Sequence, residues 1–532
     1  PIYKTKIGRE ITIAPIYENT DSETTFNWTI DGKSICTTST LTFSADEAGR
    51  YFILISATNA GGTTEKEIRI DVFQLDVPTI SIADADKGFK VLQGSELTIT
   101  PIVDSFLETS YSWQINGEDI SNELTCPLPT IELGEYQVRF ATHNEDGDDE
   151  VTFKVEVCSP DQVDFNWTFL QTEYNMSAGR TIRIKPVDVN NALDAVYTWT
   201  VDNEQVQSGE NDTYLFTSEQ QGEHTVKVEM KNSYILATQT LKVNVCPPAG
   251  TYQRKISATS SASMNKVYEY LPAPGQFINE NHNTTTMAEA CTYAEERINQ
   301  TAYVSLGGFG GYIIVGFDHS IVNDGDYNIA ITGNAFDGSS EPGIVWVMQD
   351  ENGDGLPNDT WYELRGSEYG KAETWQDYAV TYHKPTGIQL PTPWTDNHGQ
   401  SGSIDYLGAF HRQDYYYPAW VKEKQYTLRG TRLKERNYDQ SGNGTYWVND
   451  SYEWGYADNF SAIDRLTDDD NYNAGPSDNH FKISHAVTFD GKDANLKYVD
   501  FIKVQVGVNS KSGWLGEIST EVFGIKDFNM LK

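Results

Sequence analysis

One acidic segment of this 532-residue chain carries oxygen-bearing side chains at short, regular spacing. Asp350, Asn352 and Asp354 occupy its first, third and fifth positions, and Leu356 occupies the seventh, after a glycine. Side-chain oxygens at this spacing, together with the backbone carbonyl of the seventh residue, form the wrapping geometry that Ca²⁺ requires. The segment therefore predicts a calcium loop. The predicted ligands are Asp350, Asn352, Asp354, Leu356, Asp359 and Glu363.

Two of these ligands are invoked because the twelfth position of the loop holds Trp361 instead of glutamate. Asp359 or Glu363 would have to complete the shell. The flanks also differ from a helix–loop–helix site, since the strand-like segment 343–348 leads into the loop. The alternative is an acidic hairpin that is closed by its own Asx turns and binds no ion.

Aromatic side chains are concentrated in a polar stretch at about residues 411–456. Strand alternation cannot place three consecutive tyrosines on one side, so we expect some of them to face water or a ligand. Aromatic faces near Asn, Asp and Arg bind sugars or flat macrocycles. The alternative is a core with a tyrosine-rich surface. The predicted ligand-binding residues are His411, Tyr415, Tyr416, Tyr417, Trp420, Tyr446, Trp447 and Trp454.

Signatures of catalysis are weak. The chain contains no G-x-S-x-G, no H-E-x-x-H and no phosphate loop. Glu453 and Asp458 could serve a glycosidase, but a chain with 77 acidic residues offers many such pairs. A second acidic segment, 467–473, lacks ligand spacing and is expected to be a solvated turn. We therefore expect a protein that is not an enzyme.

The composition of the chain limits the classes of partner that it could bind. The formal net charge of −38 opposes binding to nucleic acid and to anionic membrane surfaces. No run of 18 apolar residues occurs, so we expect no transmembrane segment. The five cysteines include no C-x-x-C, and a bridge between Cys158 and Cys246 is not expected. The chain begins at Pro1 without Met, from which we expect that a leader region was removed.

The elements that must position these residues begin with an internal repeat. Trp28, Trp113 and Trp199 stand 85 and 86 residues apart, and each precedes an acidic or Asn-containing turn. A Gly-x-Tyr signature follows in two copies, with His224 replacing the Tyr in the third. Each copy then continues through a segment of alternating residues that ends at an Asn. A fixed period indicates an array of like modules.

Period-2 alternation within the repeats predicts short strands, with each Trp as a buried anchor. In the first copy we expect Trp28, Ile30, Phe52 and Leu54 to share a face. Short Pro-containing joints near residues 72–78 and 157–160 favour semi-rigid connections.

The remainder of the chain reads as a different domain. Residues 287–299 have apolar positions on one helical face, with Thr284 or Thr285 as the expected cap and Cys291 buried. Later segments are apolar on both faces, which suggests a large two-sheet sandwich, while the stretch from about 385 to 480 is expected to form long loops.

We therefore predict an all-β protein. Three tandem Ig-like (PKD-like) β-sandwiches would occupy 1–74, 75–158 and 159–247, followed by a larger jelly-roll-like β-sandwich at 248–532 with long loops and one short helix. The repeat signature resembles the polycystic-kidney-disease (PKD)-like domains of surface proteins, which mostly act as spacers or adhesion surfaces.

The segments 333–336, 340–348, 350–368 and 513–522 resemble surface lipoproteins of gut Bacteroidetes. Some of these look like accessory cobalamin-binding proteins that work beside an outer-membrane corrinoid transporter. The resemblance implies a lipid-anchored cell-surface protein whose anchor lies outside this chain. It would capture cobalamin on residues 248–532 and pass it to a TonB-dependent transporter. The alternatives are a glycan-binding surface protein and an adhesin without a small ligand.

Overall fold

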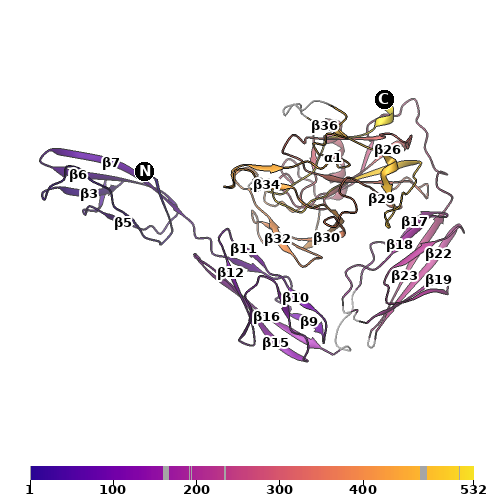
Figure 1. The fold of residues 1–532 in the computed structure, drawn as a ribbon, viewed down its shortest axis with the longest axis horizontal. Coiled ribbons are helices and arrows are strands. Elements are labelled where there is room, and N and C mark those ends of the chain that lie inside the picture. The colour runs from indigo at the N-terminus through magenta and orange to yellow at the C-terminus, as the bar shows by residue number, and fades with distance from the viewer. Residues whose placement is uncertain are drawn as a thin grey trace. The chain divides into compact units, whose positions relative to one another are not determined.

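The computed structural model describes residues 2–159, 167–190, 192, 194–232, 235–467, 476–513 and 516–532 (Figure 1). By internal contacts the chain forms two compact units, of which the first contains 1–88, 103–126 and 136–155 and the second contains 89–102, 127–135 and 156–532. Most of the acidic segment 467–473 lies outside the described residues, so its expected turn stays a prediction.

The first repeat is a small sandwich in the first unit. Its larger sheet has the order β1-β7-β6-β3-β4, in which β1 runs parallel to β7, and β2 pairs with β5. The strands are β1 (Ile2–Lys6), β2 (Ile11–Ile13), β3 (Thr25–Ile30), β4 (Lys33–Cys36), β5 (Leu41–Phe43), β6 (Gly49–Asn59) and β7 (Gly62–Phe73).

Trp28 is the fully buried anchor of this sandwich, and its indole N–H donates to the carbonyl of Thr38 (2.8 Å). The expectation for β6 is wrong by one residue. The register pairs Trp28 with Ile55 and Ile30 with Ile53, so Ile53 and Ile55 face the core while Phe52 is exposed. A shift of one position moves every side chain of a strand to the other face.

The second repeat contributes strands to both units. In the first unit β13-β12-β15-β16 lie side by side and β8 pairs with β11; in the second unit β10 pairs with β14. Trp113 is again fully buried. The strands are β8 (Thr79–Ser81), β9 (Phe89–Leu92), β10 (Leu97–Ile99), β11 (Ile102–Asp104), β12 (Ser110–Ile115), β13 (Glu118–Ser121), β14 (Cys126–Leu128), β15 (Gly134–Asn144) and β16 (Gly147–Cys158).

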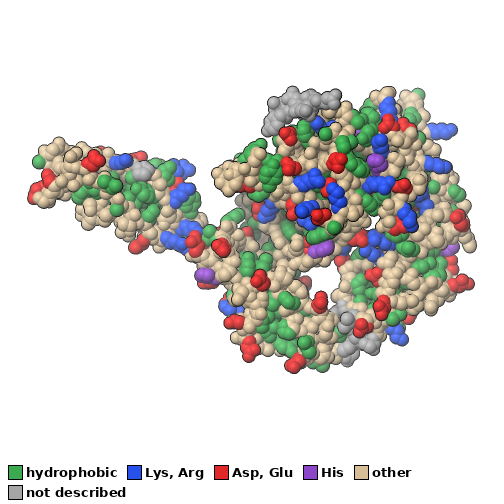
Figure 2. All heavy atoms as spheres, viewed as in Figure 1, with side chains coloured by type: hydrophobic (Ala, Val, Ile, Leu, Met, Phe, Trp, Pro, Cys, Tyr) green, Lys and Arg blue, Asp and Glu red, His purple; other side chains and the backbone are tan. Residues whose placement is uncertain are grey.

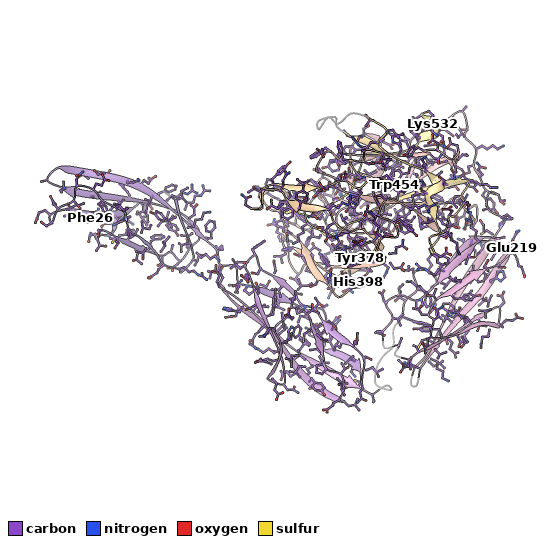
Figure 3. All side chains as sticks on the ribbon, viewed as in Figure 1. Phe26, Glu219, Tyr378, His398, Trp454 and Lys532 are labelled. Atoms are coloured by element: carbon purple, nitrogen blue, oxygen red, sulfur yellow. The ribbon has the colours of Figure 1, made fainter. Side chains whose placement is uncertain are left out.

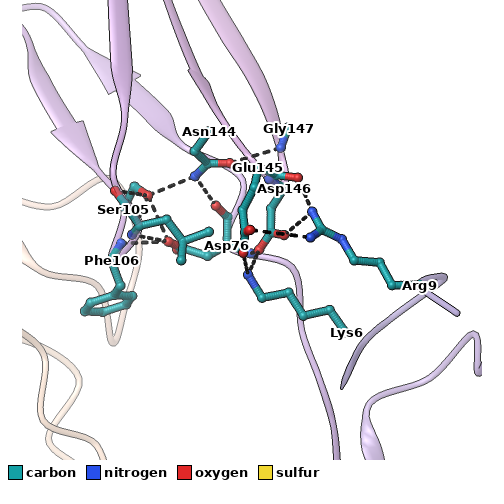
Figure 4. A network of polar contacts seen from close by, with 10 residues as sticks. Lys6, Arg9, Asp76, Ser105, Phe106, Asn144, Glu145, Asp146 and Gly147 are labelled. Atoms are coloured by element: carbon teal, nitrogen blue, oxygen red, sulfur yellow. Dashed lines mark hydrogen bonds and ion pairs between the residues drawn. The ribbon is translucent and has the colours of Figure 1, made fainter. Parts of the chain in front are cut away.

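A polar network joins the first two repeats within the first unit (Figure 4). The buried carboxylate of Asp146 contacts Lys6 Nζ (2.6 Å) and the guanidinium of Arg9 (2.7 Å). It also accepts the backbone N–H of Asp76 (2.8 Å), in the linker. Asn144, the Asn that ends the second repeat signature, donates to the Asp76 carbonyl (2.6 Å). Because the Asp146 carboxylate of the second repeat binds both the first repeat and the linker, polar contacts as well as the short linker hold this joint.

The third repeat lies in the second unit. Its sheet has the order β17-β23-β22-β19-β20, and β18 pairs with β21. Trp199 is fully buried, but its indole N–H has no partner among the described residues. The strands are β17 (Glu173–Ser177), β18 (Thr181–Ile184), β19 (Val196–Val201), β20 (Glu204–Gly209), β21 (Tyr214–Thr217), β22 (Gly222–Lys231) and β23 (Leu236–Cys246).

The remaining domain is built from antiparallel sheets. The largest has the order β24-β26-β38-β28-β29-β37, and the others are β36-β27-β40, β32-β31-β30-β33, β25-β39 and β34-β35. The first elements are β24 (Lys266–Leu271), α1 (Met287–Asn299), β25 (Val304–Ser305), β26 (Tyr312–Val322), β27 (Ile329–Gly333), β28 (Gly343–Met348), β29 (Trp361–Leu364), β30 (Trp375–His383), β31 (Thr392–Asp396) and β32 (Ser401–Ile404). The later ones are β33 (Gln425–Arg432), β34 (Asn437–Asp439), β35 (Trp447–Asn449), β36 (Ser477–Phe481), η2 (Ile483–His485), β37 (Ala486–Val487), β38 (Tyr498–Val506), β39 (Glu521–Val522), β40 (Gly524–Asp527) and η4 (Phe528–Met530).

The predicted helix forms α1 with its expected bounds, but its cap differs. Thr286, not Thr284 or Thr285, is the N-cap, and it forms a capping box with Glu289. Cys291 packs half-buried against the core. The five cysteines, all within the described part of the chain, form no disulfide with one another. The all-β fold class with tandem Ig-like repeats is confirmed, with α1 the only α-helix among the described residues.

Candidate functional site

The structure places part of the predicted aromatic surface inside the protein. Tyr416 and Tyr417 are each 1% exposed and Trp420 is 6% exposed, and all three belong to the main core cluster. The expectation that their rings face water or a ligand is wrong for these residues. Burial is possible because the Tyr416 hydroxyl donates to the His411 carbonyl (3.1 Å) and the Tyr417 hydroxyl to the Glu423 carbonyl (2.9 Å).

The other predicted aromatics do not form one surface. Tyr415 is half-buried under Lys384, Nζ of which lies 5.6 Å from the ring centroid. Tyr446 is 59% exposed at the start of β35, beside the half-buried Trp447. His411 pairs with Glu280, Nδ1 to Oε1 at 2.6 Å.

Trp454, which is labelled in Figure 3, lines a cavity of about 240 Å³. Its ring lies 5.1 Å from that of His485, centroid to centroid. Tyr446 and Trp447 do not line this cavity, so the eight predicted residues are divided among the core, the surface and the cavity at Trp454.

The predicted calcium loop is closed by its own hydrogen bonds. The carboxylate of Asp350 accepts the backbone N–H groups of Gly353 (2.7 Å) and Gly355 (3.0 Å). The carboxylate of Asp354 accepts the side-chain amides of Asn352 (2.9 Å) and Asn358 (2.9 Å). This is the Asx-turn arrangement of the alternative interpretation, and calcium binding by the loop stays a prediction.

The last predicted ligands have different surroundings. Asp359 is 3% exposed, and its Oδ1 has no hydrogen-bond partner among the described residues. Burial raises the pKa of this carboxyl to about 8, although the hydrogen bond from the Glu351 N–H acts to lower that pKa. Glu363 lies on β29 and accepts the hydroxyl of Thr431 (2.6 Å). Leu356 is 47% exposed.

A cleft of about 640 Å³ within the second unit is a candidate site for ligand binding. One wall comes from β17, β18 and residues 185–189 of the third repeat, and the other comes from β28, β29, β33 and β38 of the large domain. Its size lies in the usual range for small-molecule sites. Its aromatic lining residues are Tyr174, Trp346, Trp361, Tyr362, Tyr369 and Phe489.

Cross-strand pairing builds the centre of the cleft. Trp346 on β28 stands opposite both Glu363 on β29 and Lys503 on β38, so the three side chains share one face of the sheet. Trp361 is two residues from Glu363 and lies on the same face. Lys503 Nζ lies 4.8 Å from the ring of Trp346 and 5.3 Å from that of Trp361.

Lys503 is the cation with an unusual environment here. Its ammonium forms no ion pair with any residue in the described part of the chain, and burial lowers its pKa to about 8. Burial likewise raises the pKa of Glu363 to about 7, although the Thr431 hydroxyl and Lys503 oppose the shift. The cleft thus holds an aromatic wall with a partly desolvated cation over it.

Ion pairs between the two walls border the cleft. Arg183 contacts Asp377 (3.0 Å), and Lys185 contacts the same carboxylate (2.8 Å). Arg429 of the large domain pairs with Asp188 of the third repeat. Beyond Asp377, Tyr378 and His398 lie with ring centroids 5.6 Å apart (Figure 3). Figure 2 shows Lys and Arg side chains interspersed with acidic ones on the visible face of the large domain.

Sequence patterns did not predict this cleft. Trp346 and Lys503 lie in segments interpreted as strands with two apolar faces, and the third repeat was interpreted as a spacer. The available signal was Lys503 in the middle of β38, because a charged side chain in a mostly buried strand is costly unless a partner or a site uses it.

A family model of the PKD-like domain matches residues 1–59, 77–144 and 149–232. The three PKD-like repeats are therefore present, although the matched ranges leave the predicted domain boundaries untested. No curated protein matches the chain. No helix in the described part of the chain is long and apolar enough to cross a membrane.

Solved structures match across the repeats and beyond. Fibronectin(III)-like modules of Clostridium thermocellum CbhA are 15% identical, with a TM-score of 0.17, over 34% of this chain and 100% of theirs. The titin fragment I67–I69 is 14% identical, with a TM-score of 0.23, over 47% and 96%. The Bacteroides ovatus protein SGBP-B, in complex with a mixed-linkage heptasaccharide, is 12% identical, with a TM-score of 0.17, over 94% of each chain.

Proposed function

We propose that this chain is a cell-surface glycan-binding protein whose ligand occupies the cleft between the third repeat and the large domain. The carrying observation is the pair Trp346 and Trp361 with Lys503 above their rings. Indole faces pack against the C–H faces of sugar rings, and the flanking charged groups supply hydrogen bonds to hydroxyls. The proposed role is binding without catalysis.

The lining favours a sugar over a corrinoid. No histidine lines the cleft among the described residues, so cobalt would find no imidazole ligand there. The charged groups Arg183, Asp377 and Lys503 instead match the hydroxyl and carboxylate groups of a saccharide. The PKD-like repeats, typical of surface proteins, support the proposed location.

A glycan array on the full chain, followed by calorimetry with the best hit, tests the proposal. Trp361→Ala should weaken binding at least about tenfold, because stacking area is lost. Tyr446→Ala is the matched control: it removes an exposed ring outside the cleft and should leave affinity unchanged. Loss of binding in the control alone would move the site to the loops first predicted from the sequence.

Corrinoid capture and transfer to a TonB-dependent transporter is the second candidate, supported by the resemblance of segments 340–348 and 350–368. A visible-absorbance titration with cyanocobalamin separates the two. Saturable binding with no array hit would favour the corrinoid. Neither ligand binding would favour an adhesive role for the repeats.

We also propose that the Asp350 loop binds Ca²⁺, supported by the ligand spacing and by the unpartnered, buried Oδ1 of Asp359. Calcium should raise the melting temperature of the full chain, and Asp354→Asn should reduce that shift. An equal shift in the variant would assign the ion to another site.

A further inference from the structure

Three carboxylates from distant parts of the sequence meet inside the large domain. Glu341 lies just before β28, Asp458 follows the segment that pairs with Gly343, and Glu521 begins β39. One carboxylate oxygen from each lies within 4.8 Å of the other two. Asp458 is 1% exposed and Glu521 is 4% exposed, while Glu341 is partly exposed.

The backbone fixes Asp458 in this cluster. Its Oδ1 accepts the N–H groups of Asn334 (2.8 Å) and Ala335 (2.9 Å), and its Oδ2 accepts the N–H of Glu521 (2.9 Å). A Cβ on Gly333 would lie 2.5 Å from Asp458 Oδ1, so only glycine permits this approach. These three N–H groups orient the carboxylate and act to lower its pKa, but burial has the larger effect and raises the pKa of Asp458 to about 7.

No protein cation balances these charges. No Lys, Arg or His in the described part of the chain lies within ion-pair distance of the three carboxylates. Glu521 Oε1 is buried and has no hydrogen-bond partner among the described residues. Burial and mutual repulsion raise the pKa of Glu341 and of Glu521, because no described cation neutralises their charge.

We propose that Glu341, Asp458 and Glu521 form a binding site for one hard divalent cation such as Ca²⁺. Oxygens on opposite sides of a bound Ca²⁺ are separated by about 4.6–5.2 Å, twice the Ca–O distance, and the three carboxylates fit within that span. The unpartnered Glu521 Oε1 supplies an oxygen with free lone pairs. The partly exposed Glu341 leaves a route for entry.

Such an ion would tie together three segments that carry other features of the domain. Glu341 leads into β28, which contributes Trp346 to the cleft, and Asp458 orders the turn after β27. This site is separate from the Asp350 loop and independent of the ligand proposed for the cleft. The competing explanation is one proton shared between Glu341 and Glu521, whose side chains approach within hydrogen-bonding range.

Metal content and melting of the full chain distinguish an ion from a proton. After dialysis against metal-free buffer and back-titration with Ca²⁺ or Mn²⁺, about one equivalent should be lost in Glu521→Gln relative to the wild type. Chelator should lower the wild-type melting temperature by more than that of the variant, in which only the Asp350 loop could still respond. Glu517→Gln is the matched control, since Glu517 is 3% exposed, also has an unpartnered oxygen, and lies outside the cluster.

Asp354→Asn separates this site from the Asp350 loop and decides the case if Glu521→Gln does not fold. Retention of one equivalent and of part of the chelator effect in Asp354→Asn supports the buried site. Loss of both in that variant would assign the ion to the loop and overturn the proposal. No bound metal in any protein, with Glu521→Gln as stable as the wild type or more so, would establish the shared proton instead.

Discussion

At the scale of single residues, Lys503 is the group whose role can be tested most directly. It is half-buried and forms no ion pair among the described residues, and the two indoles beside it stabilise a positive charge. Its lowered pKa of about 8 means that the charge is lost over the range in which most side-chain ammonium groups stay protonated.

We predict that Lys503→Met weakens glycan binding about tenfold at pH 7 and removes the loss of affinity that the wild type shows as pH rises through about 8. Calorimetric titrations between pH 6 and about 9 measure both effects. Lys422→Met, at an exposed lysine outside the cleft, is the control. An unchanged pH profile in Lys503→Met would mean that the ligand does not sense this charge.

Glu363, on the β29 wall of the cleft, allows a test that measures the free energy of unfolding. Its folded-state pKa of about 7 lies above the unfolded value near 4.5, so the folded protein binds the proton more tightly. This contribution is fully present below about pH 4.5 and is lost as pH rises through about 7.

Glu363→Gln should therefore raise the melting temperature most above pH 7, by an amount corresponding to at most about 3 kcal/mol, and least near pH 5. Calorimetry at several pH values measures the difference. A larger gain at low pH would contradict the raised pKa.

At the scale of elements, the three repeats close their central hairpins with the same turn. Asp31 and Gly32 have φ of 49° and 76°, and Asp202 and Asn203 have φ of 48° and 72°. The two central residues of each turn are therefore in the left-handed region, as a type I′ turn requires. The third repeat keeps the conformation although Asn replaces the Gly.

We predict opposite effects of substitution at these turns. Gly32→Ala should destabilise the β3–β4 hairpin by about 1 kcal/mol, because an L-residue is strained in the left-handed backbone conformation. No steric clash adds to this cost, since nothing lies within 4 Å of the added Cβ. Asn203→Gly should stabilise the β19–β20 hairpin by a smaller amount. Amide hydrogen exchange of the hairpin peptides should change by about fivefold or less.

Alternation and turn chemistry are local, and this is why strands, hairpins and α1 could be predicted while faces and contacts could not. The phase of β6 depends on its register with β3, which places Ile53 rather than Phe52 beside the core. The rings of Tyr416 and Tyr417 are buried because the loop folds back so that the carbonyls of His411 and Glu423, five and six residues away, accept their hydroxyls. No single-strand pattern contains that information.

The cleft was hidden for a related reason at the same scale. Its centre requires β38 to lie beside β28, about 150 residues earlier in the sequence, so that Trp346 stands between Glu363 and Lys503. Spacing along the chain reveals a contiguous motif such as the Asp350 loop, but it does not reveal cross-strand neighbours.

At the scale of the whole molecule, the second unit joins a repeat to the large domain through charged contacts. Arg183 and Lys185 of the third repeat share the carboxylate of Asp377, and Arg180 donates to the carbonyl of Ala494 (2.9 Å). The third repeat is therefore a wall of the candidate site, beyond the spacer role typical of its fold.

The last prediction concerns that junction. Asp377→Ala leaves two cations facing each other without their shared partner, so the walls should separate more often and the cleft should lose preorganisation. We expect glycan affinity to fall about three- to tenfold, mainly through faster dissociation, and the loss to shrink at high salt, where the wild-type pairs are also screened. Surface plasmon resonance at low and high ionic strength measures both. Asp148→Ala, at an exposed carboxylate of the second repeat, is the control. Unchanged dissociation in Asp377→Ala would indicate that the ligand is held by the large domain alone, and Trp346 and Trp361 would then suffice without the repeat.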